Sequence, residues 1–302
     1  MPLKRNSALK SPIAKKPTNL IRNTKLRVAK KVIKKKTQTK TVSYFRLTAV
    51  LILLVLLSPF YYRYITAGFL NGWHWVNDIG EDINYRHYKS FNINVSERYT
   101  IHGIDVSYAQ GKIDWAQVKA MDENGLHVSF AIIKATEGEQ FVDSYFQRNW
   151  REAAKTGLIC GAYHYFRSQK SGKKQAQLFL KTVKLERNDM PLVVDIEKLD
   201  GVDPLTMRNA LTEFFKTIQH RTRVKPIIYS GLSFYQNYLK GYFDEYPLWI
   251  AHYDKPDRQV NRAAKWLLWQ HSSKATVNGI HHAVDFDTFK GDTLTFKSML
   301  LK

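Results

Sequence analysis

Residues 191–197 read Pro-Leu-Val-Val-Asp-Ile-Glu, an apolar run behind a proline that ends in two carboxylates. The β-branched residues predict a buried strand, from which Asp195 and Glu197 point to one face with their Cα atoms roughly 6.6 Å apart. Two partly desolvated acids at this spacing repel each other, so one is driven towards its protonated form while the other stays charged. General acid catalysis uses such a pair. The same pattern also fits a helix cap, an ion pair or a solvent-facing pair, and the rest of the chain decides between these readings.

The charge of the 302-residue chain is concentrated at its start. Residues 1–46 hold fifteen Lys or Arg and no acid, whereas the remaining thirty-two basic and twenty-six acidic residues leave only +6 of the total +21. A segment so charged and so poor in aromatics cannot bury enough apolar surface to fold, and we expect a disordered tail. Such a tail suits nucleic acid, anionic lipid or a topology signal. The apolar segment that follows disfavours nucleic acid as the partner.

That apolar segment begins directly after the tail. Leu47–Tyr62 contains no charge, Arg63 can snorkel, and Tyr64–Leu70 can extend the helix to the about twenty residues that a bilayer requires. Aromatic residues suited to a membrane interface cluster at its end: Tyr61, Tyr62, Tyr64, Trp73 and Trp75. We therefore predict an uncleaved single-pass anchor over residues 47–70, with the positive tail inside and the rest outside the cytoplasmic membrane, periplasmic or extracellular. A cleaved signal peptide with a weak processing site at 66–68 is the alternative.

The remaining chain divides at Ile101. Residues 71–100 are polar and aromatic without a clear period, and we interpret them as a juxtamembrane stalk. From residue 101 to 302, short apolar runs alternate with amphipathic stretches, which predicts alternating strands and helices. Eight strands are expected, over residues 101–106, 128–135, 158–166, 191–197, 226–230, 247–252, 266–270 and 283–286. Helices are expected over residues 114–125, 142–156, 171–183, 204–220 and 234–239. Eight strands in mainly βα order predict an α/β fold, an irregular TIM-like (β/α) barrel that lacks helices in its last third.

In such a barrel the functional site lies at the carboxyl ends of the strands. The residues near these ends are mostly carboxylates, aromatics and amides: Asp105, Glu137, Tyr163, Tyr165, Asp195, Glu197, Tyr229, Trp249, His252, Tyr253, Gln270 and Asp285. Carboxylates can protonate a glycosidic oxygen and stabilise an oxocarbenium ion, and aromatic faces stack on pyranose rings. The pattern therefore favours glycoside cleavage, although aromatics at strand ends are as often the edge of a core.

Other chemistries lack their motifs. The histidines show no HExxH or similar metal-ligand spacing, and neither a nucleophile elbow nor a nucleotide-binding motif occurs, so we expect no metal and no cofactor. The adjacent His281 and His282 read as a solvated loop pair. Cys160 lies in an apolar run, where a small buried hydrophobe is its expected role.

Several blocks of the sequence, in this order, resemble the lysozymes of glycoside hydrolase family 25, the Chalaropsis-type N-acetylmuramidases, over residues 101–289. The blocks are DVSYAQG (105–111), IDW (113–115), FAIIKATEG (130–138), GAYHYF (161–166), DIE (195–197), PIIYS (226–230), LWIAHY (248–253), WQ (269–270) and VD (284–285). A set of blocks in order is far more specific than any one of them.

The resemblance implies an irregular barrel that cleaves the β-1,4 bond between N-acetylmuramic acid and N-acetylglucosamine in peptidoglycan. Its pattern carries the general acid onto Glu197 and supporting acids onto Asp105, Asp195 and Asp285. Net retention is expected, with the substrate's acetamido group as internal nucleophile. One departure is Asp287, where the family often has Asn; it adds a negative charge near Asp285. Since no wall-binding repeats follow the barrel, the anchor is expected to hold the enzyme near its substrate.

Further residues are expected to line the glycan groove: Tyr163, Tyr165, Tyr229, Trp249, Tyr253, Gln270 and Glu137. A chitinase-like enzyme of family 18 would need acids at positions 190 and 193, which are Met190 and Val193. A catalytically weak or silent glycan-binding module of the same fold remains the alternative, and all four carboxylates argue against it.

Overall fold

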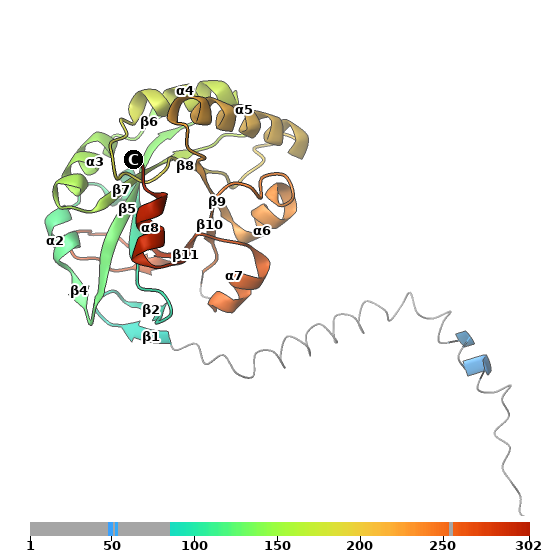
Figure 1. Cartoon of the computed structure of the whole chain (residues 1–302), viewed down its shortest axis with the longest axis horizontal. Helices are drawn as coiled ribbons and strands as arrows, with labels where there is room; N and C mark the ends of the chain where they lie inside the picture. Colours follow the sequence, from blue (N-terminus) through green and yellow to red (C-terminus); the bar gives the residue numbers. More distant parts are fainter. Residues whose placement is uncertain (1–47, 51, 54–84, 254–255) are drawn as a thin grey trace, which may run out of the picture. The chain divides into compact units, whose positions relative to one another are not determined.

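The computed structural model describes residues 48–50, 52–53, 85–253 and 256–302 (Figure 1). The expected tail, most of the expected anchor and the first half of the expected stalk lie outside these residues. Residues 48–50 and 52–53 are helical. Among the described helices, none is both long and apolar enough to cross a membrane. The chain divides into two compact units, residues 1–79 and 80–302, and the second contains the described barrel.

The second unit is built on a closed barrel of eight strands (Figure 1). These strands are β3 (His102–Val106), β5 (Leu126–Glu137), β7 (Ile159–Tyr165), β8 (Val193–Asp195), β9 (Ile227–Gly231), β10 (Leu248–Ala251), β11 (Leu268–Ala275) and β12 (Val284–Phe289). The order around the barrel is β3-β12-β11-β10-β9-β8-β7-β5, and β5 pairs back with β3 to close it. All eight expected strands are present. Seven are parallel, but β12 is antiparallel to both β11 and β3, a reversal that the pattern of apolar runs does not predict.

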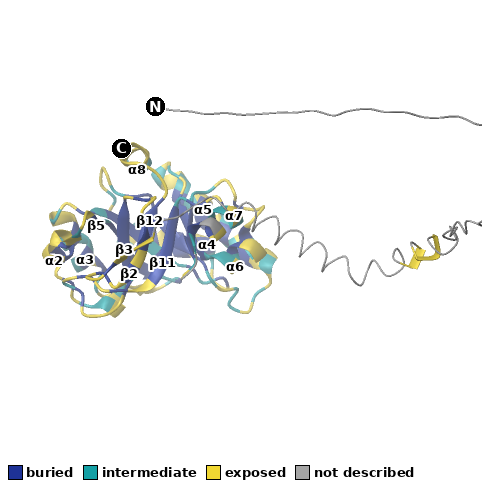
Figure 2. Ribbon diagram, turned by 90° about the horizontal axis from the view of Figure 1, so that it is seen from below, coloured by how far each residue is buried: buried dark blue, intermediate teal, exposed yellow. Residues whose placement is uncertain are grey.

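Helices surround the barrel, and the last of them lies across one end of it (Figures 1 and 2). They are α2 (Trp115–Ala120), α3 (Phe146–Lys155), α4 (Gly172–Thr182), α5 (Pro204–Thr222), α6 (Leu232–Phe234) running into a π-helical turn (Tyr235–Leu239), α7 (Asp257–Ala263) and α8 (Thr293–Met299). Helix α5 begins as expected, with the Asp203 carboxylate accepting from two backbone N–H groups and proline at the first turn. Helix α3 begins later than expected, because Phe141 and Val142 form the short strand β6 that pairs with β5. Helices α7 and α8 were not predicted.

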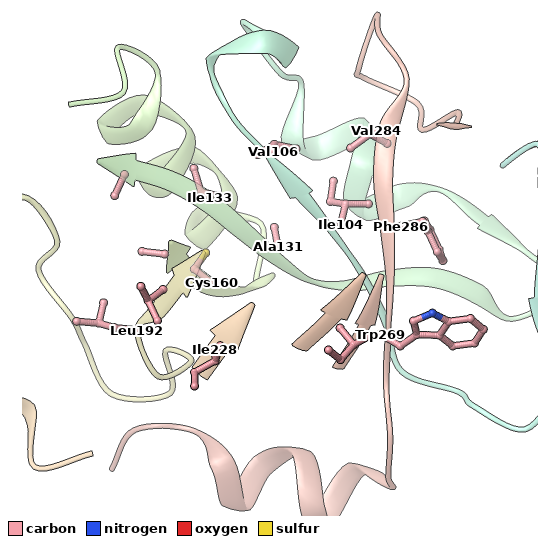
Figure 3. Close-up of a cluster of buried hydrophobic side chains, with 14 of the residues drawn as sticks. Ile104, Val106, Ala131, Ile133, Cys160, Leu192, Ile228, Trp269, Val284 and Phe286 are labelled. Carbon is pink, nitrogen blue, oxygen red and sulfur yellow. The ribbon is translucent and has the colours of Figure 1, made fainter. Parts of the chain in front are cut away.

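Side chains of the barrel strands alternate between two cores, as the two-residue period of a strand requires. The inner core fills the barrel and includes Ile132, Val193, Ile227, Trp249, Leu268 and Phe289. The outer core lies between barrel and helices and includes Ile104, Ile133, Cys160, Ile228 and Phe286 (Figure 3). Cys160 is a buried free thiol, which is the structural role expected for it. Polar residues on the inner rows therefore lie directly above an apolar floor.

One end of the barrel is closed by α8 (Figure 2). Phe296 of this helix packs on Phe130 and Phe289, with ring centroids 5.5 Å and 4.9 Å apart. Gly103 makes room for this floor, since a Cβ at that position would lie 2.3 Å from the Phe130 ring. The carboxyl ends of the parallel strands lie at the opposite end of the barrel from α8. The functional site is therefore expected at that open end.

Residues 85–100 differ from the expected stalk. Tyr85–Tyr88 (β1) and Ile93–Ser96 (β2) form an antiparallel hairpin, of which Tyr88, Ile93 and Val95 belong to the outer core. Phe91 at its turn is fully buried, with its ring 5.6 Å from that of Phe286 in β12. The folded unit therefore begins before Ile101, because these apolar side chains need the barrel wall to be buried.

Candidate active site

The antiparallel direction of β12 explains how Asp285 reaches the site. The amino end of β12 lies beside the carboxyl end of β3, and Asp285 is the register partner of Asp105. Asp105 is 7% exposed, whereas Asp285 is only partly buried. Burial raises the pKa of Asp285 to about 6, and the negative charge of Glu197 adds to the shift. Two carboxyl groups from opposite ends of the sequence thus share one edge of the barrel.

Asp195 and Glu197 lie at the carboxyl end of β8, although the strand is shorter than expected and only Asp195 belongs to it. Asp195 is the last residue of the strand and is 7% exposed, whereas Glu197 lies in the following loop and is more exposed. Burial raises the pKa of both groups, and the charge of Glu197 raises that of Asp195 further. The Asp195 Oδ1 atom is buried and receives no hydrogen bond from the residues that the structure describes. It is thus an acceptor without a donor.

Gln270 of β11 connects three strands beneath these acids. Its Oε1 accepts hydrogen bonds from the hydroxyl groups of Tyr229 at 2.8 Å and Tyr253 at 2.5 Å. Its Nε2 donates to Asp105 Oδ2 at 2.5 Å. Because the oxygen is occupied by two donors, the amide can present only its N–H to Asp105. Gln270 therefore fixes the orientation of Asp105 and holds one hydrogen bond on that carboxyl.

A charged network forms the rim beside Asp195. Glu137 accepts from Lys134 Nζ at 2.7 Å and from Arg167 Nη2 at 2.5 Å, and these cations lower its pKa against its burial. The Lys134 ammonium lies 5.1 Å and the Arg167 guanidinium 4.8 Å from the centroid of the Tyr165 ring. Glu137 is therefore held in ion pairs, and the positive charge of Lys134 also lowers the pKa values of Asp195 and Glu197 against their burial.

The predicted groove residues fall into two groups. Tyr253 is 40% exposed, and Tyr163, Tyr165 and Glu137 are partly exposed. The other three are buried: Tyr229, Trp249 and Gln270. Trp249, at 1% exposed, cannot offer a ring face to a sugar, which corrects the expectation that it lines the groove. Its indole Nε1 instead donates to Asp287 Oδ1 at 2.8 Å within the inner core.

Two exposed aromatic residues at the same end of the barrel were missed. Tyr108 follows β3 and is 52% exposed, and Phe141 in β6 is 44% exposed, with ring centroids 6.1 Å apart. Asp143 accepts hydrogen bonds from the backbone N–H groups of Tyr108 and Tyr145, which ties the two loops together. Tyr108 lies inside the block DVSYAQG, so the sequence carried a signal for it.

No cluster of three or more His, Cys, Asp or Glu side chains in the described part of the chain is arranged to hold a metal ion. The site consists of carboxyl groups with raised pKa values, an amide, tyrosine hydroxyls and exposed rings. This arrangement can deliver a proton and stabilise a positive charge.

A closed barrel with paired carboxylates at the carboxyl ends of its strands is an arrangement suited to glycoside hydrolysis. The chain belongs to the family described as glycosyl hydrolases family 25, whose sequence model matches residues 104–280. It is a glycoside hydrolase with lysozymes and muramidases among its relatives.

Three similar proteins illustrate the range of the family. Uncharacterized protein YegX of Escherichia coli (strain K12) is 43% identical over 258 residues, 84% of this chain and 94% of that protein. Lysozyme M1 of Streptomyces globisporus is 32% identical over 205 residues, 63% of this chain and 68% of that protein. The solved structure of a family 25 glycosyl hydrolase from Bacillus anthracis is 29% identical, with a TM-score of 0.62, covering 72% of this chain and 99% of that one.

Proposed function

We propose that this protein is an N-acetylmuramidase that hydrolyses the β-1,4 bond between N-acetylmuramic acid and N-acetylglucosamine in peptidoglycan. The observation that carries the proposal is the Asp195–Glu197 pair at the end of β8, with raised pKa values and with Asp105 and Asp285 completing the acid cluster. The similarity to Lysozyme M1 supports the choice of substrate.

Glu197 is the proposed general acid. It is the more exposed member of its pair, so it can reach a bound glycan, and burial raises its pKa, which favours the protonated form that a general acid requires. The proton goes to the glycosidic oxygen as the bond to the anomeric carbon breaks. Asp105 and Asp285 supply negative charge near the developing oxocarbenium ion.

Asp195 is proposed to position the substrate. It is 7% exposed at the end of β8, and an acetamido N–H of a bound sugar would donate to its carboxyl group there. An acetamido group held in this way can attack the anomeric carbon through its carbonyl oxygen, and water then opens the cyclic intermediate. Two inversions at one carbon give net retention.

Digestion of purified peptidoglycan tests the proposal. The full-length chain is expected to release fragments with N-acetylmuramic acid at the new reducing end, identified by mass spectrometry after borohydride reduction. N-acetylglucosamine at that end would contradict the assigned bond. The anomer formed first, followed by NMR, is expected to have the β configuration, and an inverted product would contradict the mechanism. The Glu197→Gln protein serves as the control for contaminating hydrolases.

We also propose that residues 47–70 anchor the enzyme in the cytoplasmic membrane with the barrel outside. Support comes from the uncharged segment Leu47–Tyr62 and from the fifteen basic residues that precede it. A reporter that works only outside this membrane should be active when fused after residue 100 and silent when fused at residue 40. The reverse pattern would contradict this topology.

A further inference from the structure

Asp287 is an acid that the proposed mechanism does not use. It lies on β12 two residues from Asp285, points into the inner core, and is 0% exposed. Its Oδ1 accepts the hydrogen bond from the Trp249 indole N–H at 2.8 Å. Its Oδ2 is buried and receives no hydrogen bond from a donor in the described part of the chain. An ionised carboxylate would leave that oxygen both dehydrated and unpaired.

The groups around Asp287 do not favour a negative charge. Its register partner on β3 is Gly103, and the next inward residue of that strand is Asp105, whose carboxyl lies within hydrogen-bonding range. Its register partner on β11 is Gln270, whose amide is committed to Asp105 and to two tyrosine hydroxyls. Asp285 on its own strand is a third acid. The charges that face Asp287 are therefore carboxylates.

We infer that Asp287 is a neutral carboxylic acid in the working enzyme and that its O–H donates to Asp105, which makes Asp287 a positioning residue for that carboxylate. The indole N–H of Trp249 can only donate, so Oδ1 must accept and the proton must lie on Oδ2. Contact between two carboxyl groups also requires a shared proton. The Trp249 donor on Oδ1, the buried Oδ2 without a donor and the neighbouring Asp105 carboxyl group thus all support a proton on Oδ2 that is directed to Asp105.

The electrostatics agree with this assignment. Burial raises the pKa of Asp287 well above its ordinary range, and the charges of Asp105 and then Asp285 add to the shift. With the proton on Asp287, Asp105 receives two hydrogen bonds, from Gln270 Nε2 and from Asp287. Burial and the charge of Asp285 raise the pKa of Asp105 well above its ordinary range, and these two donors counteract that shift in part and hold the carboxyl group in one orientation. The inference rests on the proposed function only in the role that it gives to Asp105.

Two substitutions distinguish a neutral Asp287 that positions Asp105 from an ionised Asp287 that acts on the substrate. In D287N the amide oxygen can accept from Trp249 and the NH₂ group can donate to Asp105, so kcat should stay within about threefold of wild type. D287L has a similar volume and no hydrogen bonds, and kcat should fall about tenfold to a hundredfold through misplacement of Asp105. An ionised Asp287 that acted on substrate would instead make D287N lose about 10²–10⁴-fold. That result would overturn the inference.

Infrared difference spectroscopy of the full-length protein gives a second readout that needs no substrate. Wild type minus D287N at neutral pH should contain the C=O band of one protonated carboxylic acid, and carboxylate bands in its place would overturn the inference. If peptidoglycan were not cleaved but this band were present, the proposed function would fail while the protonation of Asp287 stood. This readout also remains decisive if D287L does not fold.

Discussion

Asp285 and Asp105 are register partners across the antiparallel strands β12 and β3. A parallel last strand would place Asp285 near the floor, because the carboxyl ends of all strands would then face the same way. Reversal of β12 brings its amino end to the catalytic side. The composition of the acid cluster therefore depends on the direction of a single strand.

The first prediction concerns Glu197. Replacement by Gln preserves shape and hydrogen bonding but provides no proton, so kcat on peptidoglycan should fall by about 10²–10⁴. Binding of the glycan should persist, since the amide fills the same space. Turnover assays with glycan-binding titrations measure the two effects, and a near-normal rate would show that another residue is the acid.

The second prediction concerns pH. Since the pKa of Asp285 is raised to about 6, its stabilising charge is absent below that pH and appears above it. The acid limb of kcat/KM should therefore lie near pH 6. The residual activity of the Asp285→Asn variant should lack this acid limb. If the acid limb is unchanged in the variant, a group other than Asp285 is responsible for it. The alkaline limb, which reports Glu197, should remain in that variant.

Much of the fold was predictable because each strand is a local apolar run. All eight runs became barrel strands, and the Asp203 cap began α5 as expected. Strand direction is not encoded in such a run, so the reversal of β12 was missed. The hairpin was missed although Ile93 and Val95 alternate with asparagines at the strand period.

The residue types that form the site could be predicted from the sequence. Their positions in the barrel relative to one another could be predicted less well. Asp195 lies on the strand that its apolar run predicted, whereas Glu197 lies beyond that strand, in the loop that follows it. Trp249 was misplaced because a residue near a strand end can lie at the rim or in the floor. Its register partner Leu268 belongs to the floor, and only the pairing of β10 with β11 reveals that level.

The third prediction concerns stability. Burial raises the pKa of Asp195 in the folded protein above its value in the unfolded chain. The free energy of unfolding is therefore highest below the unfolded-state pKa of this carboxyl group, and it falls as the pH rises towards the folded-state pKa. Asp195→Asn should therefore stabilise the protein at neutral pH by about 1 kcal/mol or more, roughly 2–4 °C in Tm, and have little effect near pH 4. Glu213→Gln, on the exposed face of α5, is the matched control. A gain in Tm that did not grow with pH would contradict this account.

The fourth prediction concerns the exposed rings of Tyr108 and Phe141. Both lie beyond the carboxyl ends of their neighbouring strands, where a long glycan can cross them. Replacing either by Ala should raise KM for polymeric peptidoglycan roughly two- to tenfold and leave kcat unchanged. Tyr242→Ala is the control, since this exposed residue precedes the amino end of β10. Equal effects in all three variants would show that the rings of Tyr108 and Phe141 do not bind the glycan specifically.

The last prediction concerns the hairpin. Phe91 is fully buried against Phe286, and its carbonyl accepts a hydrogen bond from the backbone of Thr276 at 2.9 Å, so the hairpin is attached to both β12 and the end of β11. Phe91→Ala should therefore cost about 3–5 kcal/mol and lower Tm by roughly 10 °C.

Arg86→Ala is the matched control on the same hairpin. The Arg86 guanidinium forms an exposed ion pair with Glu97 at 2.9 Å, which should contribute at most about 1 kcal/mol. Thermal melts of both full-length variants measure the difference. Because Phe91 belongs to the outer core and the acids to the inner rows, the surviving folded fraction of Phe91→Ala should keep its specific activity. If both variants melted together, the hairpin would be an appendage and the barrel would fold without it.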